Sequence, residues 1–140
     1  MQALFVTICL CLATTEVFAA CNRDQVSLRG DWGQVSFNVA VVDTDETRAQ
    51  GLMFVKSMPR FSGMLFVYDS PRQARFWMKN TLIPLDMIFI GPDGVVKALH
   101  SNAIPGDLTS IDGGSGVLVV LEINGGLADT LGINTGSQVQ

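Results

Sequence analysis

The chain has 140 residues, of which 48% are hydrophobic and 16% are charged, so it is long enough for one packed domain and too short for two. This composition excludes an intrinsically disordered chain, which would have fewer hydrophobic residues. The formal net charge is −4, so strong binding to nucleic acid is not expected.

The first twenty residues have the pattern of a secretion signal. Residues 3–13 form an uncharged apolar run, which is shorter than the ~20 apolar residues of a membrane-spanning helix. The run departs from the usual signal because no Lys or Arg precedes it. We therefore expect a signal peptide over residues 1–20 and a single β-rich domain over residues 21–140, in an exported protein.

Cys21 offers a second form of export. The sequence Phe-Ala-Ala-Cys at residues 18–21 approximates the lipobox of bacterial lipoproteins, in which the cysteine is acylated after cleavage. Ordinary cleavage after Ala19 is the alternative. The protein is accordingly expected in the periplasm or as an envelope lipoprotein, with Cys21 as the lipidation site and its lipid as the only membrane contact. The other two cysteines precede Cys21, so the domain is not expected to contain a disulfide.

Residues 34–42 alternate between apolar and polar side chains, which predicts a half-buried antiparallel strand with Val39 and Val41 on its buried face. A helix is expected to follow from residue 44 to about residue 52, because Asp43 and Glu46 have the spacing of a capped helix start. Ala49 would then pack inward while Arg48 points elsewhere.

The stretch over residues 76–96 carries most of the interpretable signal. Its apolar run from residue 82 to residue 90 is interrupted only by Asp86, and alternation places Asp86 on one face with Ile88 and Ile90. Because the opposite face is apolar too, this strand should be covered on both sides, with Asp86 buried. Residues 91–94 should close a hairpin.

Later in the chain, residues 100–116 are expected to form the longest loop, residues 117–123 a buried strand and residues 126–131 a short helix. An earlier turn is expected at residues 69–72. About eight short strands with one or two short helices predict a mainly β fold, namely a compact β-sandwich or an open barrel.

Four stretches together resemble a bacterial and archaeal family known as domain of unknown function 192. They are Phe-Trp-Met-Lys-Asn-Thr at 76–81, Gly-Leu-Met at 51–53, Gly-Met-Leu-Phe-Val at 63–67 and Leu-Glu-Ile-Asn-Gly-Gly at 121–126. The resemblance implies a compact β-rich domain of jelly-roll-like character, but no reaction, because the family is uncharacterised. One position departs from the pattern: Val55 stands where the family has a second arginine, and Lys56 would replace it imperfectly.

The common catalytic sets are missing. The single histidine, His100, has only the adjacent Ser101, and neighbouring residues on a strand point to opposite faces. Phosphate-binding loops and the ligand spacing of zinc or iron sites are absent as well, so no cofactor and no metal are expected. The methionines are best explained as core residues.

Positive charge is concentrated in one part of the chain. Between residues 48 and 79, Asp69 is the single acid among six bases. The simplest interpretation is a set of solvated loop residues, and the alternative is a basic face for an anionic ligand or for lipid headgroups. The six bases are Arg48, Lys56, Arg60, Arg72, Arg75 and Lys79.

Six residues within or against hydrophobic segments are the candidate ligand-binding site. An ionised group in such a segment is costly unless it is paired, so the carboxyl groups are expected to meet the cations, with an aromatic wall beside them. A structural network is the alternative interpretation. The candidates are Arg48, Trp77, Lys79, Asn80, Asp86 and Glu122.

Two functions follow from these observations. The first is an exported or lipid-anchored envelope domain that acts as a binding or structural module for a small molecule, a polymer or a protein. The alternative is a hydrolase or lyase that uses Asp86 or Glu122 as general acid or base.

Overall fold

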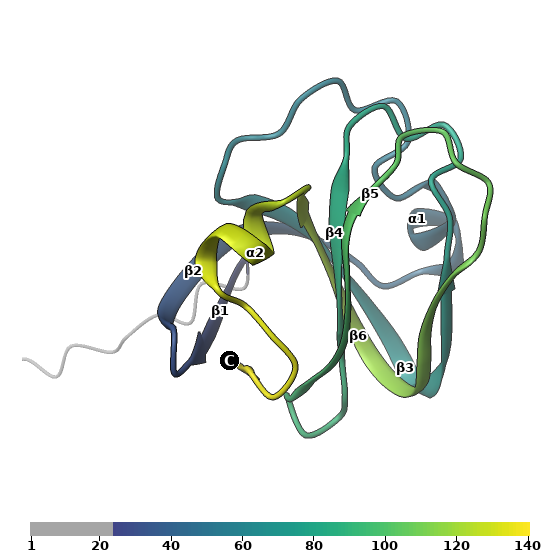
Figure 1. Cartoon of the computed structure of the whole chain (residues 1–140). Coiled ribbons are helices and arrows are strands. Elements are labelled where there is room, and N and C mark those ends of the chain that lie inside the picture. The colour runs from purple at the N-terminus through teal and green to yellow at the C-terminus, as the bar shows by residue number, and fades with distance from the viewer. Residues whose placement is uncertain (1–23) are drawn as a thin grey trace, which may run out of the picture.

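The computed structural model describes residues 24–140, which fold into a curled seven-stranded sheet with two short helices (Figure 1). The expected signal peptide and Cys21 lie outside the described residues. No helix within the described part is long and apolar enough to cross a membrane. The elements are β1 (Gln25–Gly30), β2 (Gly33–Val42), α1 (Asp45–Gln50), β3 (Ser62–Phe76), β4 (Leu85–Ile90), β5 (Val96–Ala103), β6 (Ile111–Asn124), α2 (Leu127–Leu131) and β7 (Gln138–Val139).

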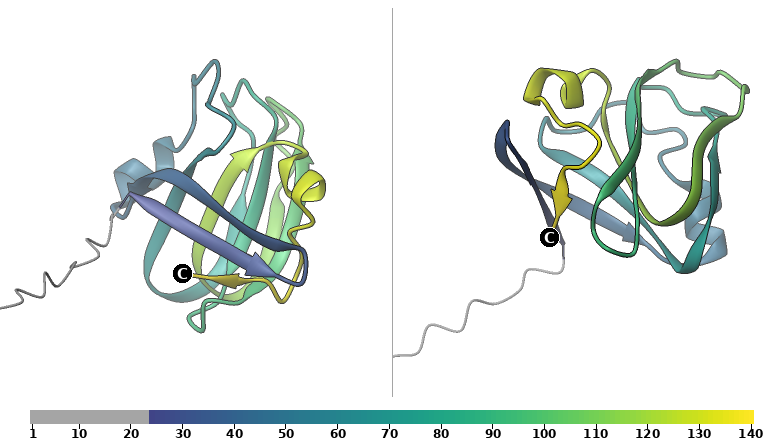
Figure 2. Two further views of the ribbon diagram at one scale, coloured as in Figure 1. Left: turned by 90° about the vertical axis from the view of Figure 1, so that its left-hand side faces the viewer. Right: turned by 60° about the horizontal axis from the view of Figure 1, so that its bottom comes forward.

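The sheet is an open barrel. Its strand order is β5-β4-β6-β3-β2-β1-β7, and all neighbours are antiparallel except β2 and β3. In the left view of Figure 2, the sheet curls so that β1 and β2 run across the front of the other strands. An isolated bridge between Val95 and Gln138 connects the start of β5 to β7, at the other end of the strand order. The predicted mainly β fold is confirmed.

Strand β4 lies between two hydrophobic cores, and all six of its residues are buried. Ile88 and Ile90 belong to one core, on the side of α2, whereas Met87 and Phe89 belong to the other. In Figure 1, β4 stands in the middle of the molecule with α2 on one side and α1 on the other. The prediction of a strand covered on both faces is confirmed.

Asp86 connects β4 to its surroundings through main-chain donors. It is 0% exposed, and its Oδ1 accepts from the main-chain N–H groups of Asn102 at 2.7 Å and Gly126 at 2.8 Å. Its Oδ2 accepts from the N–H of Ala128 at 2.7 Å, in the first turn of α2. The helix cap Gly126 has no side chain to do this, so Asp86 supplies the capping group.

The prediction that Asp86 is buried and hydrogen-bonded is therefore confirmed, but the expected partners were wrong. Arg48, Lys79 and the Asn80 amide do not reach it. Asp86 pairs with Ile123 in the sheet and shares its face, whereas the basic residues lie over the opposite face. Main-chain N–H groups at a helix start satisfy the carboxyl group without any cation.

Helix α1 differs from the prediction in its start and in its buried side. Thr44, rather than Asp43, is the N-cap, and it forms a capping box with Thr47. Ala49 is exposed, while the Arg48 side chain is only 10% exposed. Arg48 turns inward because its guanidinium donates to two main-chain carbonyls, a stronger constraint on this short helix than the burial of one methyl group.

Strands β3 and β6 continue through segments that were expected to be turns or loops. The turn predicted at residues 69–72 lies inside β3, and most of the loop predicted at 100–116 belongs to β5 and β6. Register shifts between Val67 and Arg72 bend this ribbon and absorb residues that break the alternation. Gly113 is a packing glycine, since an added Cβ would lie 2.1 Å from the Phe89 ring.

The end of β2 differs from the prediction. Val41 is 44% exposed, although it was expected on the buried face, while Val42 is buried in the second core. The alternation itself is regular, since β2 pairs with β3 without a register shift up to Val42, but the first core no longer covers Val41.

Removing the Asp86 carboxyl group should destabilise the fold. Asp86→Ala leaves one buried and two partly buried N–H groups without their acceptor, and we expect the free energy of unfolding to fall by on the order of 2 to 4 kcal/mol. Asp86→Asn keeps one acceptor oxygen and should lose less. Urea denaturation measures both, with Asp31→Ala at an exposed aspartate as the control. Equal stability of Asp86→Ala and the control would show that the three hydrogen bonds are not structural.

Candidate functional site

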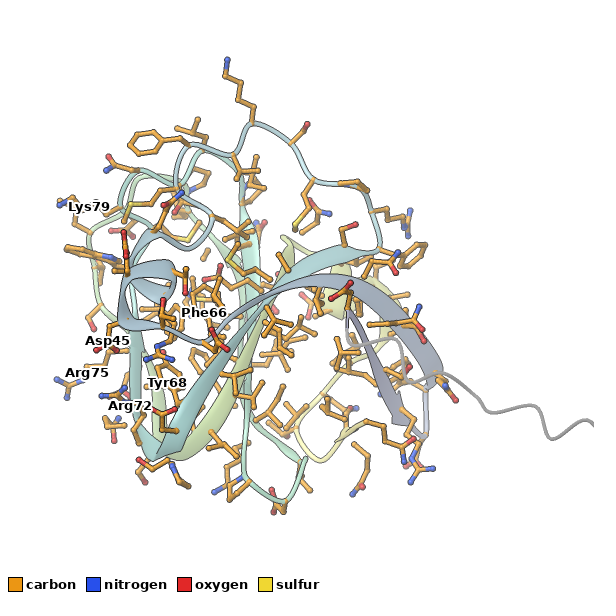
Figure 3. All side chains as sticks on the ribbon, turned by 180° about the vertical axis from the view of Figure 1, so that it is seen from behind. Asp45, Phe66, Tyr68, Arg72, Arg75 and Lys79 are labelled. Carbon is orange, nitrogen blue, oxygen red and sulfur yellow. The ribbon has the colours of Figure 1, made fainter. Side chains whose placement is uncertain are left out.

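A pocket of about 290 Å³ opens between α1, the bent part of β3 and the segment that follows β3. Four bases, four aromatic side chains and one buried acid line it. Figure 3 shows its labelled residues along one side of the molecule, with Phe66 deeper inside. These residues are Arg48, Arg72, Arg75 and Lys79, then Phe66, Tyr68, Phe76 and Trp77, and finally Glu122.

Tyr68 on β3 organises two of the bases. The guanidinium carbon of Arg48 lies 5.0 Å from the centre of the Tyr68 ring, and that of Arg72 lies 4.8 Å from it. Burial raises the pKa of Tyr68 above its ordinary value of 10, although Arg72 and Arg48 act in the opposite direction. The phenol therefore stays protonated at neutral pH and can donate a hydrogen bond.

The four bases differ in how their charges are compensated. Arg48 is held by main-chain carbonyls and by Asp45, whose carboxyl oxygen lies 2.7 Å from its guanidinium nitrogen. Arg75 has an exposed contact with Asp112 at 4.0 Å, which is worth little. Within residues 24–140, Arg72 and Lys79 form no ion pair. The pocket therefore keeps positive charge that is available to a ligand.

Lys79 and Trp77 form the outer edge of the pocket. The Lys79 ammonium lies 5.1 Å from the centre of the Trp77 ring, within the range of a cation–π contact. Trp77 is 48% exposed, so it also leaves a ring face open to a bound molecule. The segment after β3 thus places a charge and an aromatic surface together.

Glu122 is the buried acid of the pocket, at 4% exposure. In the sheet it lies opposite Met64 of β3 and Met87 of β4, and its neighbours Leu121 and Ile123 point into the other core. This apolar burial raises the pKa of Glu122 to about 8. At neutral pH the carboxyl group is mostly protonated and can donate a hydrogen bond into the pocket.

The pocket contains four of the six residues that the sequence put forward. Arg48, Trp77, Lys79 and Glu122 lie together, whereas Asp86 is on the other face of the sheet. Asn80 is exposed with a left-handed φ of 54°, and its amide reaches only the Met53 sulfur at 3.9 Å. Asn80 therefore belongs to the turn after β3 and does not line the pocket.

Five of the nine pocket residues named above were missed as members of a site: the aromatic residues Phe66, Tyr68 and Phe76, and the bases Arg72 and Arg75. The sequence feature that could have revealed the two bases is the concentration of six bases between residues 48 and 79, four of which line this pocket. Arg72, Arg75 and Lys79 are exposed, as the simplest interpretation expects, but they line one pocket together with the nearly buried Arg48. Only the bend of β3 brings them together, and the sequence was expected to form a turn there.

Val55 stands where the family has a second arginine, and no neighbouring base takes the place of that arginine in the pocket. Val55 packs against the second core, and Lys56 is exposed and absent from the pocket lining. His100 is exposed on β5 and is also outside the pocket lining. Within residues 24–140 no group of three or more His, Cys, Asp and Glu side chains could hold a metal.

The fold and the pocket define a small open-barrel domain whose concave site is basic and aromatic. The chain belongs to the family of domain of unknown function 192, DUF192, described as "Uncharacterized ACR", whose model matches residues 26–140. The resemblance found in the sequence is thereby confirmed.

Two solved structures are similar to this chain. One, a protein of unknown function from Novosphingobium aromaticivorans DSM 12444, is 42% identical with a TM-score of 0.81, and the match covers 83% of each chain. The other, from Sinorhizobium meliloti 1021, is 37% identical with a TM-score of 0.80 over 83% of this chain and 91% of that chain. The description of the second proposes a transcription regulator. No curated protein matches the chain.

The raised pKa of Glu122 should make stability depend on pH. Because the folded-state pKa of about 8 lies above the ordinary value of 4.5, the folded state binds more protons between these two values. The stabilisation is complete below pH 4.5 and is lost as the pH rises to about 8, by up to about 5 kcal/mol. Glu122→Gln cannot ionise and should not show this loss.

Urea denaturation over this pH range measures the effect, with Glu46→Gln at an exposed glutamate as the control. We expect Glu122→Gln to become more stable than the wild type above pH 8, while Glu46→Gln keeps the wild-type pH dependence. Parallel profiles for all three proteins would show that Glu122 ionises at an ordinary pKa.

Proposed function

We propose that this domain binds a small organic anion in the basic pocket, as the binding module of an exported or lipid-anchored envelope protein. The observation that carries the proposal is the convergence of four bases on one concave site beside a buried, protonated carboxyl group. Like charges repel one another, but Tyr68 holds the guanidinium groups of Arg48 and Arg72 beside each other, and a main-chain carbonyl also holds Arg48.

The pocket supports a ligand with both charge and a flat apolar part. Arg72 and Lys79 are free to pair with an anionic group, and a guanidinium suits a carboxylate or a phosphate. Trp77 and Phe76 provide aromatic surface beside them. A volume of about 290 Å³ is at the small end for ligand pockets, which favours a ligand with a single ring.

Glu122 gives the pocket a dependence on pH. In its protonated form it can donate a hydrogen bond to an anionic oxygen, and in its ionised form it would repel the same oxygen. Affinity for an anion should therefore fall as the pH rises through about 8.

The role proposed for the Sinorhizobium protein is not extended to this chain. The bases of the present chain face a concave pocket beside a buried acid, and its formal net charge is −4. Nucleic acid binding is typically marked by a basic stripe on a domain of high isoelectric point.

An acid–base enzyme is the second candidate, and the raised pKa of Glu122 favours it. Asp86 is unsuited to that role, because it is 0% exposed and accepts three main-chain hydrogen bonds. A hydrolase or lyase would therefore act through Glu122. Recovery of a bound molecule unchanged supports the binding module, and its conversion to a product supports the enzyme.

Thermal denaturation with three probes tests the binding proposal. We expect phenyl phosphate to raise the Tm, inorganic phosphate to raise it less, and benzyltrimethylammonium to leave it unchanged, because only the first combines an anion with a ring. Arg72→Gln should weaken binding of phenyl phosphate by about tenfold or more. Arg29→Gln, which changes an exposed arginine outside this pocket, should bind like the wild type.

The proposal fails if none of the anions raises the Tm, or if the cation raises it as much as phenyl phosphate does. Equal losses in Arg72→Gln and Arg29→Gln would also contradict it, because they would indicate a general charge effect rather than a site.

The export part of the proposal is supported by the apolar run before Cys21. Fractionation of the tagged wild type should place the protein in the cell envelope. If it is a lipoprotein, Cys21→Ser should release it from the membrane fraction. A wild type that stays in the cytoplasm would contradict export, and an unchanged Cys21→Ser would contradict lipid anchoring.

A further inference from the structure

Large exposed hydrophobic side chains gather at one end of the molecule, beside the pocket mouth. Five of them lie on three chain segments, and we call this set the apolar tip. Their exposed fractions range from 48% to 67%. The apolar tip consists of Phe54, Trp77, Leu82, Ile104 and Leu108.

Main-chain hydrogen bonds join the three segments. The N–H of Phe54 donates to the carbonyl of Asn80 at 2.8 Å, and the N–H of Met78 donates to that of Asp107 at 2.9 Å. The N–H of Gly106 donates to the carbonyls of Met78 and Thr81 at 3.0 and 3.1 Å. The backbone of the tip is thus well connected, and yet its apolar side chains face solvent.

This arrangement is unusual for side chains that contribute nothing outside the fold. Each side chain is about half exposed or more, and clustered exposed apolar groups promote aggregation. A set of such residues on neighbouring loops therefore indicates a surface that is covered in use.

The charges around the tip are mainly positive. Lys79 sits over the Trp77 ring, and Arg75 shares a small hollow with Trp77 and Leu108. Two acids are nearby: Asp107 accepts from the main chain of Thr109, and Asp112 lies against Arg75. Lys56 is exposed two residues after Phe54, so three bases and two acids lie around the tip, and within residues 24–140 Lys56 and Lys79 form no ion pair.

We propose that the apolar tip docks on an anionic lipid surface. Its side chains would enter the headgroup region, while Lys79, Arg75 and Lys56 meet the lipid phosphates. Single apolar side chains that project from loops, with an aromatic ring and cations beside them, suit the boundary between headgroups and acyl chains. A protein partner would fit better in an apolar groove, whereas the small hollow beside Trp77 and Leu108 is also lined by Arg75 and Ser110.

Docking of this kind would place the mouth of the basic pocket at the lipid surface. The inference does not rest on the proposed anion site, because Ile104 and Leu108 are outside that pocket. Variants of these two residues can therefore abolish docking and leave anion binding unchanged.

Fluorescence of the full chain in the Trp32→Phe background tests the proposal, since Trp77 is then the single tryptophan. Vesicles of equimolar phosphatidylglycerol and phosphatidylcholine should shift the Trp77 emission to shorter wavelength, and vesicles of phosphatidylcholine alone should shift it much less. This signal reports on the tip itself, whatever residues 1–23 contribute to membrane attachment.

The double change Ile104→Asp and Leu108→Asp should weaken the response to vesicles by about tenfold or more. The matched control, Gln25→Asp with Thr135→Asp, adds the same charge at exposed positions outside the tip and should respond like its parent.

An emission that does not change with either vesicle would overturn the proposal, even if the chain sediments with the membranes. So would an emission shift that depends on protein concentration without vesicles, which would identify a second copy of the chain as the partner. A response that is equal for both vesicles would exclude the charge recognition proposed for the three bases.

Discussion

The fold depends on a buried carboxyl group in a strand that has no solvent-facing side. Asp86 lies in β4, with apolar neighbours on both faces, and it accepts three main-chain hydrogen bonds. These bonds attach the end of β5 and the start of α2 to the centre of the sheet. An apolar residue would leave the buried N–H group of Ala128 and the two partly buried N–H groups without their acceptor, and an unsatisfied buried donor carries a substantial free-energy cost.

The candidate site depends on how side chains alternate between the two faces of β6, the strand next to β4. Because Leu121 and Ile123 of β6 point to the core that contains α2, Glu122 between them must point to the opposite side. There it meets the pocket formed where β3 bends and α1 crosses. One carboxyl group thus finds three donors and becomes structural, while the other finds apolar walls and stays protonated.

The elements with regular alternation could be predicted from the sequence. The two faces of β4, the hairpin after it and most of β2 follow from the period of two and from turn residues. Predictions failed where strands bend. Glycines within β6 and polar residues within β3 resembled turns, and only pairing across the bulges shows that these strands continue.

By itself, the sequence determined the fold class, the family and the list of polar residues that hydrophobic segments must accommodate, because these depend on local pattern and composition. The tertiary structure decided how those polar residues are divided between the two faces of the sheet. Asp86 and Glu122 lie on adjacent strands, at positions that pair one residue apart, and therefore on opposite faces. Which bases reach which carboxyl group depends on the curl of the sheet and the bend of β3, and these arise from contacts between residues far apart in the chain.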